Sequence, residues 1–198
     1  MNDVELCRRV GRGDLAAFEA LYRRYVDRVW RYARSRAGSR SETEDIVQES
    51  FLRVRRFAKG YDGRSALGTW IFAVTRSAAL DYARRERRQR ARDAVGGIIR
   101  FSEVASRVTG ASRAGTYDVG AADAAERERE QVRVAVSRLP GGQRDAIVMF
   151  ELCGMSVREV CEALKWRESR VKSALYRGRR RLREMLKDTN EAASSREL

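Results

Sequence analysis

The sequence predicts an all-α protein made of two small helical domains joined by a flexible linker. Three observations support this fold class. Apolar residues recur every three to four positions over long stretches, which is the spacing of one face of a helix. Proline occurs once in 198 residues, at Pro140, so little interrupts the helical segments. Between residues 93 and 122 the periodicity gives way to Gly, Ala, Ser and Thr, a composition typical of a linker.

The first domain is expected over residues 1–92 and contains three predicted helices. The first spans about 14–37 and carries one apolar stripe: Leu15, Phe18, Leu21, Tyr22, Tyr25, Val29, Tyr32 and Ala33. The second begins at Ser41, which with Glu44 three positions later forms the pattern of a capping box. The third runs from about 65 to 92 with an apolar face of Leu67, Trp70, Ile71, Val74 and Ala78.

The second domain is expected over residues 123–187 as a four-helix unit. Its first helix, 124–139, ends before Pro140, and its second, 144–152, ends at Gly154. Ser156 and Glu159 form another capping box and open a helix whose inner face is Val157, Val160, Cys161 and Leu164. A break near 165–167 leads into the last helix, 168–187. Two helices joined by so tight a turn indicate a helix-turn-helix, and residues 188–198 are expected to be a disordered tail.

The net charge of +14 predicts a polyanionic partner, because solubility requires far less charge. This charge is concentrated in two stretches. Residues 76–92 contain seven arginines against two acidic residues, and residues 167–187 contain nine basic residues against two acidic ones. Each stretch ends the last helix of a domain, a pattern typical of nucleic-acid binding.

The last helix has one apolar and one polar, basic face. Val171, Leu175, Gly178 and Leu182 project to one side, and Ser169, Ser173, Tyr176 and Arg180 project to the other. The second set is flanked by Arg170, Lys172 and Arg177. Hydroxyl and guanidinium groups suit base edges and phosphates of the major groove. Ser156 and the amide groups beside it are a further candidate for holding a phosphate. A basic, solvated helix without a ligand is the alternative.

The second helix carries acidic and amide residues on the side away from its apolar face. Asp45, Gln48 and Glu49 gather there around Leu52. An exposed leucine ringed by such groups on a basic protein favours a protein-binding face. The alternatives are a solvated helix with one stray leucine, or a metal site on Asp45 and Glu49, for which two carboxylates are a weak signal.

Aromatic residues near the basic third helix are candidates for stacking on unpaired bases. Phe72 and Tyr82 are less clearly directed inward than Trp70, which lies on the apolar face. The preceding loop, 59–64, combines glycines with an aromatic and polar groups, so it is a candidate pocket for an extruded base. A plain turn is the alternative reading of this loop.

Composition also restricts other function classes. The chain has no histidine, the commonest general base near neutral pH, so an enzyme is less expected. Cys7, Cys153 and Cys161 cannot complete a usual zinc site alone and are expected to be buried in a reducing compartment, with a redox pair of Cys153 and Cys161 as the alternative. No nucleotide-binding glycine loop is present, and no cofactor is predicted. Without an apolar run or a signal pattern, a soluble cytoplasmic protein without membrane insertion is expected.

Motifs in both domains resemble the bacterial sigma factors of RNA polymerase, of the compact extracytoplasmic-function type. In the first domain these are Phe18-x-x-Leu21-Tyr22-x-x-Tyr25, the run 44–51 (EDIVQESF), Thr69-Trp70-Ile71 and Asp81-Tyr82-x-Arg84-Arg85. In the second they are Leu139-Pro140-x-x-Gln143-Arg144, the run 156–160 (SVREV) and Val171-Lys172-Ser173-x-Leu175-x-Arg177. Together they cover nearly the whole chain outside the linker, in the right order.

The resemblance implies a dissociable RNA polymerase subunit, not an enzyme, that recognises promoters and melts DNA. It implies contact with the β′ and β subunits, with a core-polymerase face of Asp45, Gln48, Glu49 and Leu52. Minus-ten DNA would contact Lys59, Tyr61, Arg64, Phe72, Arg76, Ser77, Arg84, Arg85 and Arg88. Minus-thirty-five duplex would contact Ser156, Arg170, Lys172, Ser173, Tyr176, Arg177 and Arg180. An anti-sigma protein is a further candidate partner.

Four positions depart from the family pattern. Family members often have Asn where Ser77 stands and Thr where Arg170 stands. The turn between the last two helices usually has Gly and a small apolar residue in place of Lys165 and Trp166. Two other classes stay open at this point: a homodimeric helix-turn-helix regulator with the first domain as a sensor, and a metal-dependent nuclease using Asp45 and Glu49.

Overall fold

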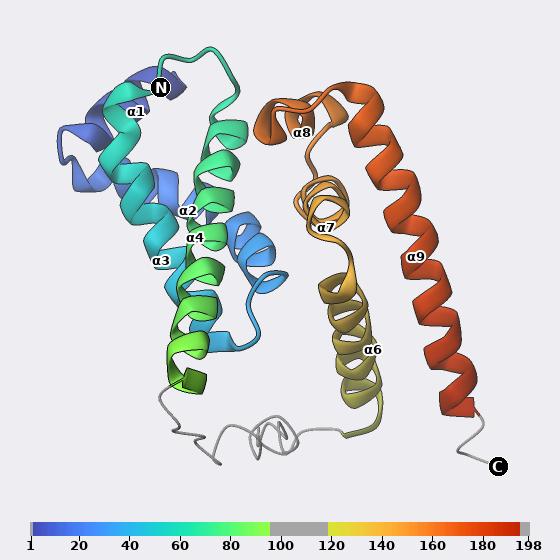
Figure 1. Cartoon of the computed structure of the whole chain (residues 1–198). Coiled ribbons are helices and arrows are strands. Elements are labelled where there is room, and N and C mark those ends of the chain that lie inside the picture. Colours follow the sequence, from blue (N-terminus) through green and yellow to red (C-terminus); the bar gives the residue numbers. More distant parts are fainter. Residues whose placement is uncertain (1, 96–118, 195–198) are drawn as a thin grey trace.

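The computed structural model describes residues 2–95 and 119–194, and these residues form helices and turns arranged as two domains (Figure 1). The first domain consists of α1 (Asp3–Gly11), α2 (Leu15–Arg34), α3 (Arg40–Phe57), the 3₁₀ turn η1 (Ala58–Gly60) and α4 (Leu67–Val95). The second consists of α6 (Val119–Arg138), α7 (Gly141–Ile147), the π-helical segment η2 (Val148–Leu152), α8 (Val157–Leu164) and α9 (Glu168–Ser194). The predicted all-α class and the two-domain architecture are confirmed.

The first domain begins with a helix that the sequence analysis missed. In α1 the side chain of Asn2 accepts a hydrogen bond from the Val4 amide, and Leu6, Cys7 and Val10 form the buried face. Nine residues are too few for an apolar period to stand out. Packing against the rest of the domain stabilises such a short helix, since its own hydrogen bonds barely offset the cost of nucleation.

The start of α3 also differs from the prediction. Ser39 is the N-cap, its hydroxyl accepting a hydrogen bond from the Glu42 amide at 3.1 Å, and the helix begins at Arg40. The Glu42 carboxylate accepts a hydrogen bond from the Gly38 amide at 2.7 Å. The predicted cap at Ser41 is therefore wrong, and Ser41 lies within the first turn.

The core of the first domain lies where α2, α3 and α4 meet. Leu21, Val29 and Tyr32 of α2 are fully buried, as are Ile46 and Val54 of α3 and Ile71 of α4. Phe51 of α3 stacks against Tyr22 and meets Phe18 edge-on, with ring centroids 4.6 and 6.4 Å apart respectively. This packing fixes which sides of α3 and α4 face outward.

The second domain ends in the predicted helix-turn-helix. The capping box at the start of α8 is confirmed: the Ser156 hydroxyl accepts from the Glu159 amide, and the Glu159 carboxylate accepts from the Ser156 amide. Val171 and Leu175 of α9 are buried with Val160 and Leu164 of α8, as their spacing predicts. Gly178 of α9 lies directly against Ile147 of α7, where an added Cβ would meet the isoleucine side chain at 2.8 Å.

The predicted limits of the linker and the tail need correction. Helix α4 continues to Val95 and α6 starts at Val119, so both ends of the predicted linker 93–122 are helical, and its middle lies outside the described residues, as does the apolar run 97–101. Helix α9 continues to Ser194, so the prediction of a disordered tail from 188 is wrong for 188–194. This stretch contains no glycine or proline and includes two alanines, which favour a helix. Residues 195–198 lie outside the description.

The two domains pack against each other. Helix α4 contacts α8, and α2 contacts η2, so that one cluster of buried apolar side chains runs through both domains. Figure 1 shows α1–α4 on one side and α6–α9 on the other. No helix among the described residues is both long and apolar enough to cross a membrane.

Candidate functional site

The outer face of α9 is polar and exposed, as predicted. Ser169, Ser173 and Arg180 are exposed, and 70% of Tyr176 is accessible to solvent. The opposite side of the helix is held by Val171 and by the contact between Gly178 and Ile147. The polar face of α9 therefore points outward because the apolar side of the same helix is buried.

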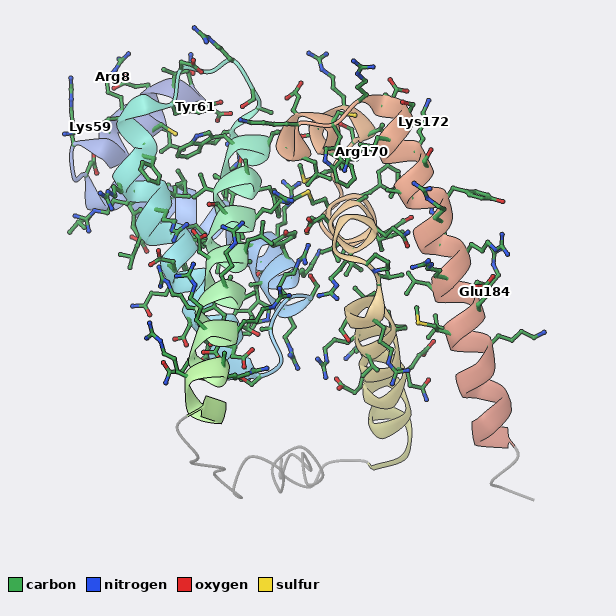
Figure 2. All side chains as sticks on the ribbon, in the orientation of Figure 1. Arg8, Lys59, Tyr61, Arg170, Lys172 and Glu184 are labelled. Carbon is green, nitrogen blue, oxygen red and sulfur yellow. The ribbon has the colours of Figure 1, made fainter. Side chains whose placement is uncertain are left out.

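The cations on α9 are held loosely by neighbouring groups. The Arg170 guanidinium lies over the Trp166 ring at 4.1 Å from its centroid. Lys172 pairs with Glu168 at 2.6 Å, and Arg180 pairs with Glu184 at 2.9 Å. All of these ion pairs are exposed, and exposed pairs contribute little, so a phosphate can replace the carboxylate. Arg170 and Lys172 lie in the first turns of α9, and Glu184 lies farther along the helix (Figure 2).

The turn before α9 contains a strained residue. Lys165 has φ 55° and ψ 44°, the left-handed conformation that usually falls to glycine at this place. Its neighbour Trp166 packs against Gly142, with the ring at 2.7 Å from where a Cβ would stand. The turn therefore accepts two large residues in different ways. Gly142 of α7 leaves room for the Trp166 ring, and Lys165 fits at the cost of backbone strain.

The acidic face of α3 is largely free for a partner. Asp45 and Gln48 are exposed, and 52% of Leu52 is accessible, an exposed apolar side chain between polar groups as predicted. Glu49 differs from them because its carboxylate accepts a hydrogen bond from Arg53 at 2.6 Å. In the described part of the chain no group of three or more metal-ligating side chains is found.

Arg53 connects the acidic face of α3 to α4. Its guanidinium pairs with Asp81 at 2.7 Å and donates to the Ser77 hydroxyl at 3.4 Å while still holding Glu49. The hydrogen bond from Arg53 lowers the pKa of Asp81 and raises that of Arg53, so both groups stay charged near neutral pH. The contact fixes α3 and α4 at the place where Ser77 turns outward.

The predicted minus-ten residues fall into three groups. Ser77, Arg84, Arg85 and Arg88 lie exposed on α4, whereas Lys59 is exposed in η1 and Arg64 in the loop that follows it. Arg76 is partly buried and points to the second domain. Phe72 is fully buried, its ring 6.2 Å from that of Tyr32. The prediction that Phe72 stacks on bases is therefore wrong for this structure, because α4 turns this ring into the interior.

The loop between η1 and α4 lines a cavity of about 640 Å³. Tyr61 is buried at its base, donating its hydroxyl to the Ser65 carbonyl at 2.7 Å and packing on Trp70. Gly63 and Arg64 line the same cavity, and Arg158 and Glu159 of α8 contribute the opposite wall. Tyr61 thus shapes the loop, whereas Lys59 lies away from α9 at the far edge of the first domain (Figure 2).

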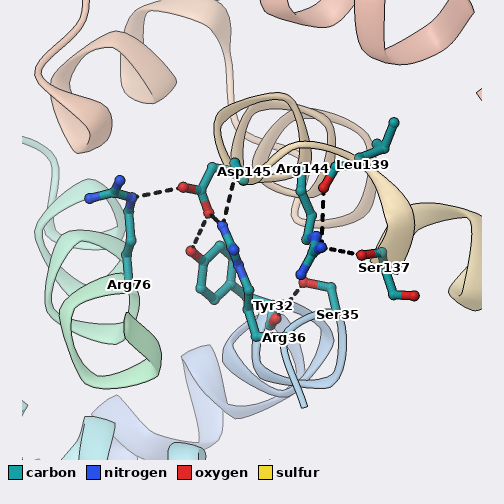
Figure 3. Close-up of polar contacts among 9 residues, drawn as sticks. Tyr32, Ser35, Arg36, Arg76, Ser137, Leu139, Arg144 and Asp145 are labelled. Carbon is teal, nitrogen blue, oxygen red and sulfur yellow. Dashed lines mark hydrogen bonds and ion pairs between the residues drawn. The ribbon is translucent and has the colours of Figure 1, made fainter. Parts of the chain in front are cut away.

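The contact between the domains contains polar residues that sequence reasoning missed. Asp145 of α7 is 2% exposed, and its carboxylate accepts hydrogen bonds from Tyr32 at 2.6 Å and from Arg76 at 2.9 Å. Arg36 also pairs with it (Figure 3). The signal in the sequence was a lone acidic residue beside the apolar run 146–150, which gives no indication of its partners.

The three cysteines are protected from reaction to different degrees. Cys7 and Cys153 are buried, and burial raises the pKa of Cys7 to about 11 and that of Cys153 to about 12. Burial also raises the pKa of Cys161, which is only partly covered. The expectation that the cysteines are buried holds for Cys7 and Cys153. The raised values mean that little reactive thiolate forms near neutral pH in this state.

Both halves of the chain match known families. Residues 21–89 match Sigma-70 region 2, and residues 129–182 match Sigma-70 region 4. The ECF RNA polymerase sigma factor SigE of Mycolicibacterium smegmatis is 30% identical over 92% of this chain and 68% of its own length. The ECF RNA polymerase sigma-E factor of Haemophilus influenzae is 29% identical over 90% and 92%.

Two solved structures have the same fold. CnrH, in complex with the cytosolic domain of CnrY, superposes with a TM-score of 0.67 at 22% identity, covering 94% of this chain and 97% of CnrH. The sigma factor RpoE of Bartonella quintana, in complex with the anti-sigma factor NepR, gives 0.64 at 21% identity, covering 86% and 96%. With two sigma domains in sequence order and relatives matched along most of their length, the chain belongs to the extracytoplasmic-function sigma factors of the sigma-70 family.

Proposed function

We propose that this chain is a dissociable promoter-specificity subunit of RNA polymerase. The observation that carries the proposal is that this chain has three separate surfaces: the acidic face of α3, the basic outer face of α4 and the basic outer face of α9. A protein partner fits the first, and DNA fits the other two. The chain acts by binding, without catalysis, in the cytoplasm where the polymerase works.

Core polymerase would bind the acidic face of α3. Asp45, Gln48 and Leu52 are exposed together, and Glu49 adds a carboxylate that Arg53 holds in place. A partly apolar face rimmed by charge complements a basic, amphipathic surface on the partner. The family resemblance assigns that surface to the β′ subunit, with β contributing elsewhere.

Minus-ten DNA would lie along the loop before α4 and the exposed side of that helix. Arg84, Arg85 and Arg88 form a row of cations for the phosphates of an unpaired DNA strand, although Arg84 also pairs with Asp81 at 3.3 Å. The loop at Gly63 and Arg64 is a place for an extruded base once α8, whose Arg158 and Glu159 wall the cavity in this structure, has moved away. Lys59, Ser77 and Arg76 complete this surface, with Arg76 available only after it leaves Asp145.

Minus-thirty-five duplex would receive α9 in its major groove. Tyr176, Ser173 and Arg177 offer groups for base edges, while Arg170, Lys172 and Arg180 offer donors to phosphates. Ser156 would donate to a phosphate only after its amide and hydroxyl leave the Glu159 carboxylate. The structures similar to this one are complexes with NepR and with the cytosolic domain of CnrY, and we extend that association to an anti-sigma partner for this chain.

The experiment is run-off transcription with core polymerase on promoters mapped after co-purification. The wild-type chain is expected to make transcription dependent on its addition. Replacing Asp45 and Gln48 together with Ala is expected to reduce that transcription at least tenfold, because it removes the polar rim around Leu52. Binding of the same variant to promoter DNA in the absence of polymerase is expected to stay unchanged.

Glu19→Gln is the matched control, since it removes one exposed acidic charge from α2, outside all three surfaces. It is expected to behave as wild type. The proposal would be overturned if transcription did not depend on the chain at any promoter and the chain alone bound palindromic duplex DNA tightly. That combination would favour a homodimeric regulator.

A further inference from the structure

The side chain of Asp145 is built into the contact between the domains. It belongs to the second domain, yet every hydrogen bond that the structure gives its carboxylate comes from the first: from the Tyr32 hydroxyl, the Arg36 guanidinium and the Arg76 guanidinium (Figure 3). Among residues whose burial the structure describes, it is the only acidic side chain that is buried. A carboxylate in that position holds the two domains together and contributes little to the stability of the second domain alone.

Two of the three groups that donate to Asp145 are cations, Arg36 and Arg76, and three arginines of residues 28–36 donate to backbone carbonyls of the second domain. Arg28 donates to the Cys153 carbonyl at 2.8 Å, Arg31 to the Leu152 carbonyl at 3.3 Å, and Arg36 to the Gly141 carbonyl at 3.2 Å. Neutral carbonyls cannot balance these charges. Removal of the charge of Asp145 would leave the partly buried guanidinium groups of Arg36 and Arg76 without this counter-ion, which is unfavourable.

The contact is also incompletely satisfied. In the described part of the chain, the Nε atoms of Arg36 and Arg144 are buried without a hydrogen-bond partner, and burial lowers the pKa of Arg144. Unpaired buried donors cost free energy that separation of the domains would recover, because water can then reach them. The closed arrangement is therefore one that a competing ligand can open.

We propose that Asp145 holds the chain in a closed, autoinhibited state in which it occupies Arg76 in place of a phosphate of promoter DNA. The inference rests on the proposed function for the identity of the competitor. Arg76 cannot offer its Nε to a phosphate while that atom donates to Asp145, and the pair orients the guanidinium toward the second domain. Opening frees Arg76 and releases α8 from the loop before α4.

The spacing of promoter elements requires the same opening. Minus-ten and minus-thirty-five sequences lie about 25 base pairs apart, which is about 85 Å of duplex. A compact chain of this length has a radius of gyration of about 16 Å and a diameter of about 40 Å. Domains in direct contact cannot place α4 and α9 on both elements at once, so the closed state is incompatible with binding to a full promoter.

The cysteines provide a direct measurement of opening. Cys153 lies in the domain contact, its thiol directed at the Arg28 carbonyl 3.5 Å away. Cys7 is buried inside the first domain, and Cys161 is partly exposed in the second. The full chain is alkylated with iodoacetamide, and mass spectrometry measures the rate at each cysteine. The rate at Cys153 reports opening of the domain contact, and the rate at Cys7 reports unfolding of the first domain. The rate at Cys161 is the reference for a thiol that the reagent can reach in the folded chain.

In the wild-type chain Cys153 is expected to react at least tenfold more slowly than Cys161. Asp145→Asn keeps the shape of the side chain, removes its charge, and is expected to accelerate Cys153 about tenfold or more without changing Cys7. Tyr32→Phe, on the other side of the contact, removes a single hydrogen bond to the carboxylate and is expected to accelerate Cys153 about threefold to tenfold.

Glu151→Gln is the matched control, because Glu151 lies on the same segment but pairs with Arg179 inside its own domain. It is expected to leave Cys153 unchanged. The proposal is overturned if Cys153 already reacts as fast as Cys161 in the wild type, or if Asp145→Asn and Tyr32→Phe leave its rate unchanged. Acceleration of Cys7 and Cys153 together would also overturn it, since that reports unfolding.

Addition of DNA separates this proposal from the proposed function. Fork-junction DNA carrying a single-stranded minus-ten element is expected to increase the alkylation rate of Cys153 in the wild type. The same DNA is expected to bind Asp145→Asn more tightly than the wild type, and the gain in affinity equals the factor by which the open fraction of the chain rises. Cys153 could instead react faster in Asp145→Asn while its rate in the wild type does not change on addition of DNA or core polymerase. This result would support Asp145 as the residue that holds the domains together, and it would refute DNA as its competitor. Failure of run-off transcription alone bears on the proposed function only.

Discussion

Phe72 shows how a single residue can satisfy a sequence pattern and still have a different role. The pattern placed it at the margin of the apolar face of α4, where stacking on bases was a reasonable prediction. In the structure its ring is buried, packs edge-on against Tyr32, and lies 5.2 Å below the Arg28 guanidinium. Burial of an aromatic ring contributes more to stability than one exposed stacking interaction would.

Phe72→Ala is therefore expected to lower the free energy of unfolding by about 3 to 5 kcal/mol, because it leaves a cavity in the core. Tyr176→Ala is the matched comparison, since 70% of that tyrosine is exposed, and is expected to change stability by less than about 0.5 kcal/mol. Urea denaturation followed by circular dichroism measures both. A stable Phe72→Ala chain with weakened DNA binding would restore the stacking role.

At the scale of the element, helix ends were harder to predict than helix interiors. Two overlapping Ser-x-x-Glu patterns, Ser39 with Glu42 and Ser41 with Glu44, stand before α3, and local sequence cannot choose between them. The structure uses Ser39, and Glu42 reaches back to the Gly38 amide. The one capping box without a competitor, Ser156 with Glu159, was predicted correctly.

The turn between α8 and α9 yields a prediction about stability. Lys165→Gly is expected to raise the free energy of unfolding by about 0.5 to 1 kcal/mol, since glycine adopts φ 55° without the strain that a Cβ causes there. Lys165→Ala keeps the Cβ and is expected to give no such gain. Thermal unfolding of both variants checks this, and a lower melting temperature for Lys165→Gly would contradict it.

At the scale of the whole molecule, the structure shows a continuous apolar cluster through both domains. Shared burial is expected to couple the unfolding of the two domains, although the sequence suggested two independent units on a linker. Tyr32 and Asp145 belong to the domain contact, and Phe72 packs against Tyr32 within the first domain, so the surface that holds Arg76 also contributes to stability.

The wild-type chain is accordingly expected to unfold in one cooperative transition, and Asp145→Asn in two. Tryptophan fluorescence can resolve them, because Trp70 reports the first domain and Trp166 the second, whereas Trp30 lines a groove with Val132 and Leu152 and also senses domain separation. A Trp30→Phe, Trp166→Phe background isolates the first domain, and circular dichroism follows both. Separate transitions in the wild type would show that the domain contact contributes too little to couple them.

The amino-acid sequence was sufficient to predict the all-α class, the two domains, the helix-turn-helix and the outward faces of α3 and α9. These follow from periodicity and local capping, which act between residues a few positions apart. The folded structure was needed to show that Phe72 is internal, that Arg53 joins Glu49 to Asp81, and that Asp145 meets Arg76 across 69 positions of the chain. Such partners are selected by burial and charge balance between distant segments, and a one-dimensional pattern contains no record of them.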